Sequence, residues 1–158
     1  MRVRGLTLVE LLVTLVILSI LAAVALPYAE VALRREQELE LRRSLRAIRE
    51  AIDVFHEDWR YGRFSSLADE VSDNGYPESL EALVDGVALA DAAGTKKRYL
   101  RRIPADPFAD SDAPLREQWR MLGYEDAPNS SIWGGEDVYD VRSTSERQAL
   151  NGTYYKDW

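Results

Sequence analysis

Residues 5–27 read GLTLVELLVTLVILSILAAVALP, and this stretch decides most of what the sequence predicts about the fold. Between residues 6 and 26 the only charged residue is Glu10, and about 20 apolar residues suffice for a helix to cross a bilayer. Arg2 and Arg4 precede the stretch, so the positive-inside rule predicts a cytoplasmic N-terminus and an exported remainder. We therefore expect a single-pass membrane helix near the N-terminus.

Glu10 bears on whether this segment is a cleaved secretory signal, a permanent signal anchor or a specialised leader. A carboxylate at the centre of a membrane helix costs roughly 2.5–3.5 kcal/mol on insertion scales and less near an end, so we expect it to have a purpose. Residues 23–25, Ala-Val-Ala, resemble a signal-peptidase site and favour a secretory signal. The apolar stretch, however, exceeds the ~7–15 residues of a signal h-region. A secretory signal also gives Glu10 no role.

The hexapeptide GLTLVE at residues 5–10 resembles the leader junction of type IV pilins and type II secretion pseudopilins. The resemblance implies that a prepilin peptidase cuts after Gly5 and methylates the new N-terminal residue, Leu6. It also makes Glu10 the glutamate that this family keeps in its mature N-terminal segment. Pro27 then falls where the family commonly carries a proline.

The chemistry of these residues agrees with the resemblance. Glycine before a scissile bond has no side chain to obstruct a protease. In a filament, Glu10 of one copy could pair with the α-amino group of Leu6 on the next copy, because a buried carboxylate needs such a partner. Pro27 lacks an N–H group, so it either kinks the helix locally or ends it at the membrane edge.

The chain continues from residue 28 to residue 60 without glycine or proline and is rich in Ala, Leu, Glu and Arg, so we expect the helix to continue to about Trp59. Apolar residues in this part recur in steps of four and three, which places them on one helical face. They are Leu41, Leu45, Ile48, Ile52, Phe55 and Trp59. We expect this stripe to pack against the chain's own sheet rather than a coiled-coil partner.

Beyond residue 60 the sequence predicts a small head. Pro77 can open a short helix that Gly86 ends. Residues 119–124 and 138–141 alternate well enough to be antiparallel strands, and residues 152–155 offer an extra edge. The expected fold is α+β and pilin-like: a long N-terminal helix, transmembrane in its first half, packed on a small antiparallel sheet.

We expect four parts in the chain. They are a cytoplasmic leader peptide (1–5), the transmembrane half of the helix (6–27), its amphipathic periplasmic half (28–60) and a globular periplasmic head (61–158).

The head also resembles the major pseudopilin of type II secretion systems. The landmarks are Gly75-Tyr76-Pro77, the turn at residues 103–107, the stretch at residues 138–143 and Asp157-Trp158. This likeness implies a structural subunit that polymerises into a periplasmic pseudopilus and drives export of folded proteins across the outer membrane.

The implied partners are copies of itself, minor pseudopilins, the prepilin peptidase, an inner-membrane assembly platform with its ATPase and, indirectly, a secretin. Before assembly the subunit would lie in inner-membrane lipid with its N-terminus cytoplasmic and its head periplasmic. A type IV or competence pilus subunit is an alternative, since the leader does not distinguish them. An alternative of another class is a membrane-anchored periplasmic enzyme or binding domain.

Major pseudopilins usually bind calcium in a C-terminal loop, and the resemblance points to residues 143–152 here. This loop lacks the expected aspartate, and Arg147 would place a positive charge in the cage. The remaining weak oxygen donors are Ser143, Glu146, Asn151 and Asp157. We therefore expect a loop closed by hydrogen bonds, with no cofactor.

Composition argues against several other functions. The net charge of −7 and the pI near 4.8 disfavour nucleic-acid binding, which needs a positive surface. The chain has no cysteine, and its one histidine, His56, is expected at the edge of the packed helical face. Acid pairs such as Asp106 with Asp110, or Glu136 with Asp137, have no base or metal motif nearby, so we expect no enzymatic activity.

Overall fold

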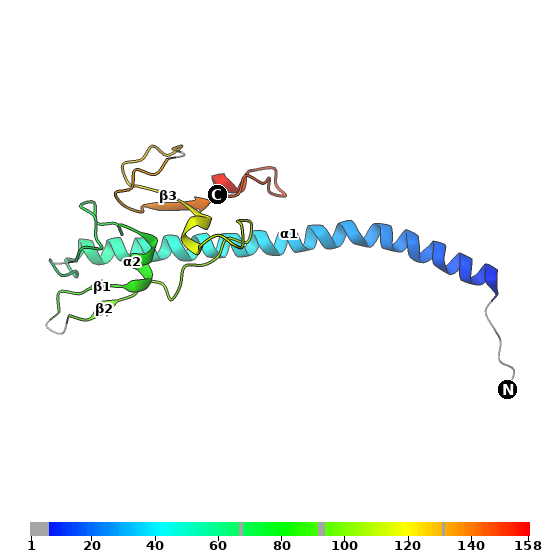
Figure 1. The fold of residues 1–158 in the computed structure, drawn as a ribbon, viewed down its shortest axis with the longest axis horizontal. Helices are drawn as coiled ribbons and strands as arrows, with labels where there is room; N and C mark the ends of the chain where they lie inside the picture. The colour runs from blue at the N-terminus through cyan, green and yellow to red at the C-terminus, as the bar shows by residue number, and fades with distance from the viewer. Residues whose placement is uncertain (1–6, 67, 92–93, 131) are drawn as a thin grey trace, which may run out of the picture. The chain divides into compact units, whose positions relative to one another are not determined.

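The computed structural model describes residues 7–66, 68–91, 94–130 and 132–158. Its first element is helix α1 (Leu8–Arg60), and the chain divides into two units, residues 1–36 and 37–158, with α1 running through the boundary. The second unit adds short elements around the distal half of α1 (Figure 1). They are α2 (Leu80–Asp85), β1 (Val87–Ala88), β2 (Lys96–Lys97), the 3-10 helix η1 (Leu115–Gln118), β3 (Trp119–Leu122), β4 (Asp140–Ser143) and the 3-10 helix η2 (Tyr155–Asp157). This is the expected α+β, pilin-like fold.

Helix α1 confirms the continuous helix predicted from the sequence. It passes through Pro27 without ending, so of the two alternatives for this proline, the helix stop at the membrane edge is wrong. The ring nitrogen has no hydrogen to offer the carbonyl of Ala23, but 53 residues of helix continue around this single missing bond. The helix ends where Gly62 adopts a positive φ of 65° and donates its N–H to the carbonyl of Trp59.

The apolar stripe on α1 forms the base of the core. Five of its six members, from Leu41 to Phe55, are at most 3% exposed. Trp59 is the exception at 39% exposure, and its indole ring lies over the backbone of Gly75. A Cβ on Gly75 would come within 2.3 Å of that ring, and its φ of 80° favours glycine, so this close approach needs glycine.

Helix α2 begins later than the sequence predicts. Ser79 caps it by accepting a hydrogen bond from the N–H of Ala82, and Gly86 ends it with a φ of 83°. Pro77, the predicted first residue, instead lies in extended chain that forms a bridge with Val71 and accepts the N–H of Val138 through its carbonyl. A side-chain cap provides the missing hydrogen-bond partner at the start of a helix, which proline cannot do.

The predicted antiparallel sheet is present, with shifted boundaries. Strands β3 and β4 pair with Trp119 opposite Ser143 and Leu122 opposite Asp140. Strand β4 starts two residues later than predicted because Val138 bonds to Pro77 rather than to β3. Strands β1 and β2 form a second antiparallel pair that the sequence did not predict. Residues 152–155 do not extend the β3–β4 sheet, since Tyr154 bridges Gln148 instead.

A buried carboxylate ties this second strand pair to α1. Asp58 is 1% exposed and accepts hydrogen bonds from Lys97 Nζ at 2.5 Å, Tyr99 Oη at 2.7 Å and Arg63 Nη1 at 2.7 Å. Burial raises the pKa of this carboxyl, but the hydrogen bonds that it accepts lower it more, so the pKa lies below its ordinary value. Burial and the hydrogen bond to Asp58 likewise raise the pKa of the Tyr99 phenol.

We predict that Asp58→Asn destabilises the head by about 2 kcal/mol, because the amide cannot serve as a charged acceptor for these donors. A depressed carboxyl pKa contributes stability that is full above pH ~4 and is lost as the pH falls through the folded-state pKa. The difference between variant and parent should therefore shrink below pH ~4. Urea unfolding of the full chain in detergent, followed by near-UV circular dichroism, measures it.

The matched control is Glu70→Gln. Glu70 pairs with Lys96 at 3.2 Å on the surface, where such pairs contribute about 0–1 kcal/mol. Equal losses in the two variants, or a difference for Asp58→Asn that does not change between pH 7 and pH 3, would contradict the role of the buried carboxylate.

Candidate functional site

The first turn of α1 carries the sequence-predicted assembly residues. Gly5 and Leu6 lie outside the described residues. Thr7 precedes the helix, and its Oγ1 accepts the backbone N–H of Glu10 at 3.3 Å, which satisfies one of the free donors at the helix start. The Glu10 side chain is exposed.

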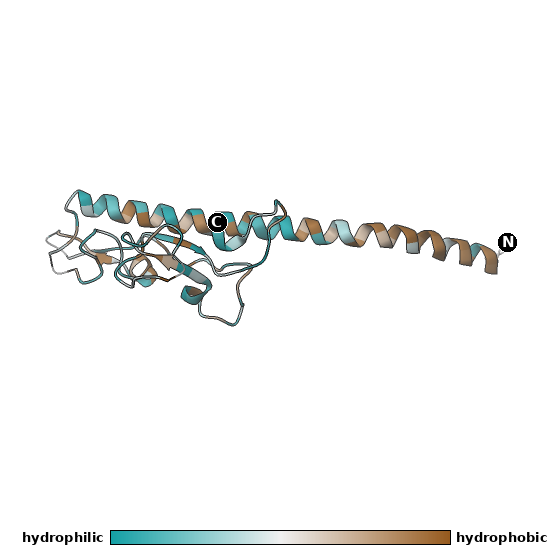
Figure 2. Cartoon of the chain, turned by 90° about the horizontal axis from the view of Figure 1, so that it is seen from above, coloured by the Kyte–Doolittle hydropathy of each residue, from teal (hydrophilic) through white to brown (hydrophobic). Residues whose placement is uncertain are grey.

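The apolar half of α1 exposes its side chains along its described length. Its large hydrophobic side chains from Leu8 to Leu26 are between 48% and 79% exposed. Figure 2 shows this half as a hydrophobic run that gives way to mixed character along the rest of α1. Among the described residues, α1 is the one helix long and apolar enough to cross a membrane. Lipid, or other copies of the same segment, would provide apolar surroundings for these side chains, as the head does for the apolar stripe in the second half of α1.

Glu10 differs from the other polar residues of this segment. Thr14 donates its hydroxyl to the carbonyl of Leu11 at 2.8 Å, and Ser19 donates to that of Leu15 at 2.8 Å. These hydroxyls need no outside partner. Within residues 7–66, 68–91, 94–130 and 132–158, the carboxylate of Glu10 has neither a hydrogen-bond donor nor a cation. If this charge leaves the polar interface for an apolar environment, it needs a partner, and that partner would have to come from outside these residues.

The weak calcium candidates have separate partners in the head. The Ser143 hydroxyl donates to Asp106 at 2.5 Å, and Glu146 pairs with Lys156 at 3.8 Å. Asn151 Oδ1 accepts both the N–H and the hydroxyl of Thr153. Asp157 lies in η2. In the described part of the chain, no group of three or more His, Cys, Asp or Glu side chains is placed to hold a metal ion.

The acidic residues considered for catalysis organise turns instead. Asp106 is 4% exposed, and besides the Ser143 hydroxyl it accepts the N–H of Phe108 at 2.8 Å. Asp110 accepts the N–H of Asp112 at 3.0 Å. Asp137 is 1% exposed and accepts the N–H of Tyr124 at 2.7 Å. Carboxylates bound in this way to backbone groups hold loops closed.

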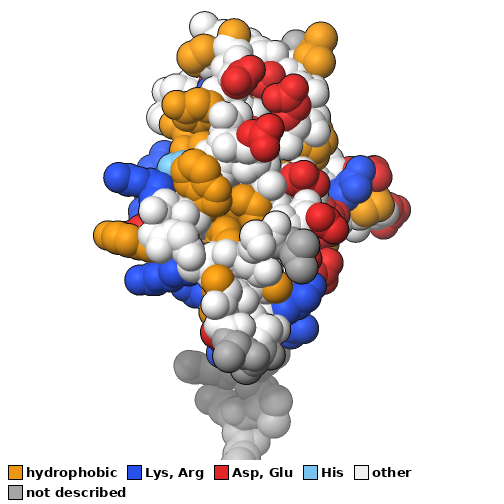
Figure 3. Space-filling model, turned by 90° about the vertical axis from the view of Figure 1, so that its left-hand side faces the viewer, with side chains coloured by type: hydrophobic (Ala, Val, Ile, Leu, Met, Phe, Trp, Pro, Cys, Tyr) orange, Lys and Arg blue, Asp and Glu red, His pale blue; other side chains and the backbone are white. Residues whose placement is uncertain are grey.

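Figure 3 shows acidic side chains gathered on the end of the head, above a hydrophobic patch. Among the acidic residues of the head, Glu125, Asp126 and Glu136 line a small hollow of about 180 Å³ together with Asp137. Asp126 accepts the N–H groups of Gly123 and Gly134, at 2.7 Å and 3.1 Å. The Asp126 carboxylate therefore holds the loop between Gly123 and Gly134 closed.

His56 occupies the predicted edge of the packed face. Its ring stacks on those of Tyr76 and Trp59, with 4.2 Å and 5.4 Å between ring centres. Its Nδ1 lies 3.2 Å from the carbonyl oxygen of Gly75. These contacts give the histidine a packing role.

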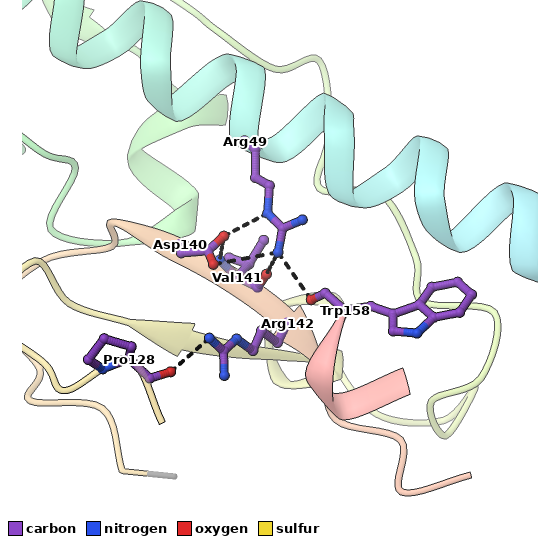
Figure 4. A network of polar contacts seen from close by, with 6 residues as sticks. All are labelled: Arg49, Pro128, Asp140, Val141, Arg142 and Trp158. Carbon is purple, nitrogen blue, oxygen red and sulfur yellow. Dashed lines mark hydrogen bonds and ion pairs between the residues drawn. The ribbon is translucent and has the colours of Figure 1, made fainter. Parts of the chain in front are cut away.

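Arg49 is a residue whose importance the sequence did not reveal. Its guanidinium donates to Asp140 at 2.7 Å, to the carbonyl of Val141 at 3.0 Å and to that of Trp158 at 3.1 Å (Figure 4). One side chain of α1 thus holds both β4 and the segment at Trp158. The only sequence signal is an arginine next to the apolar stripe, which also describes many solvent-exposed arginines.

The comparisons with known proteins bear on the N-terminus. Residues 1–26 match the model of the prokaryotic N-terminal methylation motif. The chain carries a prepilin-type leader. This supports a type IV pilin-like family, whose members are structural rather than enzymatic. No curated protein and no solved structure matches the chain.

The leader and α1 together fit a membrane-anchored, single-pass protein. A prepilin-type leader implies processing by a prepilin peptidase and assembly into pilus-like filaments.

We predict that Pro27→Ala slows hydrogen exchange of the amides around residue 27 at least tenfold. The substitution restores a backbone donor to the carbonyl of Ala23, and proline in a helix interior costs ~3 kcal/mol. Hydrogen–deuterium exchange of the full chain in detergent measures the effect. Leu26→Ala is the control, since it changes the neighbouring side chain and leaves the backbone donors intact. Equal exchange in Pro27→Ala and the parent chain would contradict a local weakness at this position.

Proposed function

We propose that this chain is a pseudopilin that polymerises into the periplasmic pseudopilus of a type II secretion system and so drives export of folded proteins across the outer membrane. The observation that carries the proposal is the Glu10 carboxylate, which has no partner among the described residues and lies in an exposed apolar helix directly behind a prepilin-type leader. The head landmarks given above favour a pseudopilin over other pilin-like proteins.

The proposed division of labour follows the sequence. Residues 1–5 keep the precursor oriented in the inner membrane until the prepilin peptidase cuts after Gly5 and methylates Leu6. Residues 6–27 hold the subunit in lipid and later bundle in the filament core. Residues 28–60 continue α1 into the periplasm, and residues 61–158 form the periplasmic head, which presents the filament's outer surface.

The proposed pairing explains why a costly carboxylate is kept. In lipid, Glu10 near the start of the helix can remain close to the polar interface, where its cost is small. When helices bundle, cleavage and methylation leave a cationic amine on Leu6 of the next copy. This amine is the proposed partner of Glu10. A charge pair in a low-dielectric bundle strongly disfavours a register in which either charge is left alone. The pairing would therefore fix the axial position of each copy.

The remaining proposed partners are minor pseudopilins, the inner-membrane assembly platform with its ATPase and, indirectly, the secretin. We also propose that the head needs no cofactor and that its C-terminal loop closes by hydrogen bonds alone. The partners of Ser143 and Asn151 within the head support this.

The mature N-terminus tests the leader. Mass spectrometry of the protein purified from membranes should find N-methyl-leucine at Leu6, because cleavage after Gly5 creates the amine that the proposal requires. An N-terminus at Leu26 would indicate a secretory signal, and retained Met1 a plain anchor. Either result would remove the proposed function.

Glu10→Ala tests the charge pair. Processing should continue, while the yield of assembled filaments falls at least tenfold, because the amine of each incoming copy loses its counter-ion. Thr14→Ala is the matched control, since that hydroxyl bonds to its own helix. Filament yield equal to that of the parent chain would contradict the pairing.

Loss of the gene product distinguishes a pseudopilus from a type IV or competence pilus. A pseudopilin deletion should retain exoproteins in the periplasm and leave surface pili unchanged. Loss of surface pili with normal secretion would instead favour the type IV pilus alternative.

A further inference from the structure

Aromatic rings from α1 and from three separate parts of the head form one continuous cluster. The His56 ring stacks between those of Trp59 and Tyr76. Tyr76 in turn contacts Tyr124 and Tyr139, with 5.5 Å and 5.2 Å between ring centres. The rings of Tyr124 and Tyr139 also meet edge to face at 5.6 Å. We call these five residues the aromatic cluster: His56, Trp59, Tyr76, Tyr124 and Tyr139.

The aromatic cluster is buried at its centre and exposed at its edge. Tyr76 is 8% exposed, whereas Tyr124 and Tyr139 are 55% and 48% exposed. The backbone fixes both exposed residues, because the N–H of Tyr124 donates to Asp137 at 2.7 Å and that of Tyr139 donates to the carbonyl of Leu122 at 2.8 Å. Exposed rings that are already held in place lose little conformational freedom when a partner binds.

Unpaired acidic side chains adjoin the aromatic cluster. Burial raises the pKa of the Tyr76 phenol, and nearby groups that include Asp53 raise it further. Glu125 follows Tyr124 in the chain and lines the small hollow described above together with Glu136. In the described part of the chain, Asp53, Glu125 and Glu136 enter none of the ion pairs. Figure 3 shows acidic and hydrophobic side chains on one face of the head.

Other exposed rings of the head receive a cation from the chain itself, since the face of an aromatic ring attracts positive charge. Arg63 lies over the ring of Tyr61 and Lys156 over that of Tyr154, at 5.2 Å and 5.6 Å from the ring centres. Among the described residues, no lysine or arginine lies over a ring of the aromatic cluster. The cluster therefore combines exposed rings with unpaired carboxylates and has no cation of its own.

We propose that the aromatic cluster and its acidic neighbours form a docking site for a basic segment of another protein. Arginine or lysine side chains of that segment would lie over the exposed rings and pair with Asp53 and Glu125. Arginine suits both contacts, because its planar guanidinium stacks on rings and donates two N–H groups to a carboxylate. This inference goes beyond the proposed function and does not depend on it, because binding to the head requires no filament.

Charge complementarity favours this occupant over others. An anionic lipid surface would be repelled by Asp53, Glu125 and Glu136. A sugar ring or an apolar helix could stack on the tyrosines, but it would leave the carboxylates without a counter-charge where the contact removes water. In the described part of the chain, no three acidic side chains are placed to hold a metal ion. A basic segment satisfies the rings and the carboxylates together.

Fluorescence anisotropy tests the site with a labelled peptide in which arginine alternates with glycine and serine. The full chain, in detergent and at ~0.15 M salt, should bind this peptide saturably. The combined variant Tyr124→Ala with Tyr139→Ala should bind about fivefold more weakly, because the exposed ring faces are lost. The matched control is Tyr124→Phe with Tyr139→Phe, which keeps the rings and should stay within about twofold of the parent.

A second pair of variants separates this site from the overall charge of −7. Asp53→Asn with Glu125→Gln should weaken binding about fivefold, because it removes the carboxylates beside the rings. Asp112→Asn with Glu117→Gln removes the same formal charge at exposed positions outside the cluster, and should leave binding within about twofold of the parent. Equal losses in the two combined variants would show attraction by net charge alone and would overturn the proposal.

The peptide itself supplies a further control. Replacing each arginine by citrulline, which is uncharged but similar in shape, should abolish binding. Equal binding of the citrulline peptide would indicate stacking without a cation and would contradict the proposed partner. No saturable binding of the arginine peptide by the parent chain would overturn the proposal outright. So would unchanged affinity in the tyrosine-to-alanine variant.

Nuclear magnetic resonance of the parent chain in detergent locates the peptide without any substitution. The arginine peptide should shift the indole N–H signal of Trp59 and leave that of Trp119, which is 2% exposed and donates to the carbonyl of Pro104. Equal shifts at both tryptophans, or none at Trp59, would place the peptide elsewhere and refute the site. Self-association of the parent chain that the peptide cannot compete away, with the same signals shifted, would identify a second copy as the occupant and refute the proposed partner.

Discussion

The proposed function depends on one group, the carboxylate of Glu10. It lies in a helical segment whose hydroxyl groups are satisfied by their own helix and whose apolar side chains ask only for lipid or for one another. Away from the polar interface the charge needs a partner, and the described residues contain none. A prepilin-type leader is a means of creating such a partner, because trimming and methylation yield a cationic amine at a fixed position. The proposed function follows from this one unmet requirement.

The head consists largely of irregular segments packed on α1, and few of its backbone groups are paired in strands. Its strands are two to four residues long, so ladders alone satisfy few backbone groups. Side chains of α1 take over this task. Asp58 holds the β2 region through Lys97 and Tyr99, and Arg49 holds β4 and Trp158. Glu38 accepts the N–H of Leu150 and the hydroxyl of Tyr155. Helix α1 thus forms one side of the hydrophobic core and also binds the irregular segments of the head through its polar side chains.

The sequence alone determined the elements that depend on local pattern. The length of apolar chain predicted the membrane segment, the absence of glycine and proline after Pro27 predicted the continuous helix, and the spacing of Leu41 to Phe55 predicted its buried face. The junction at residues 5–10 was readable in the same way, because a protease recognises a short linear segment.

Tertiary structure decided what depends on contacts between distant residues. It moved the start of β4 because Val138 bonds to Pro77, and it used Ser79 rather than Pro77 to open α2. It placed Trp59 over Gly75 and gave Asp58 and Arg49 their partners. None of these pairings leaves a periodic signal, because each joins side chains or backbone groups that only the packed head brings within hydrogen-bond distance.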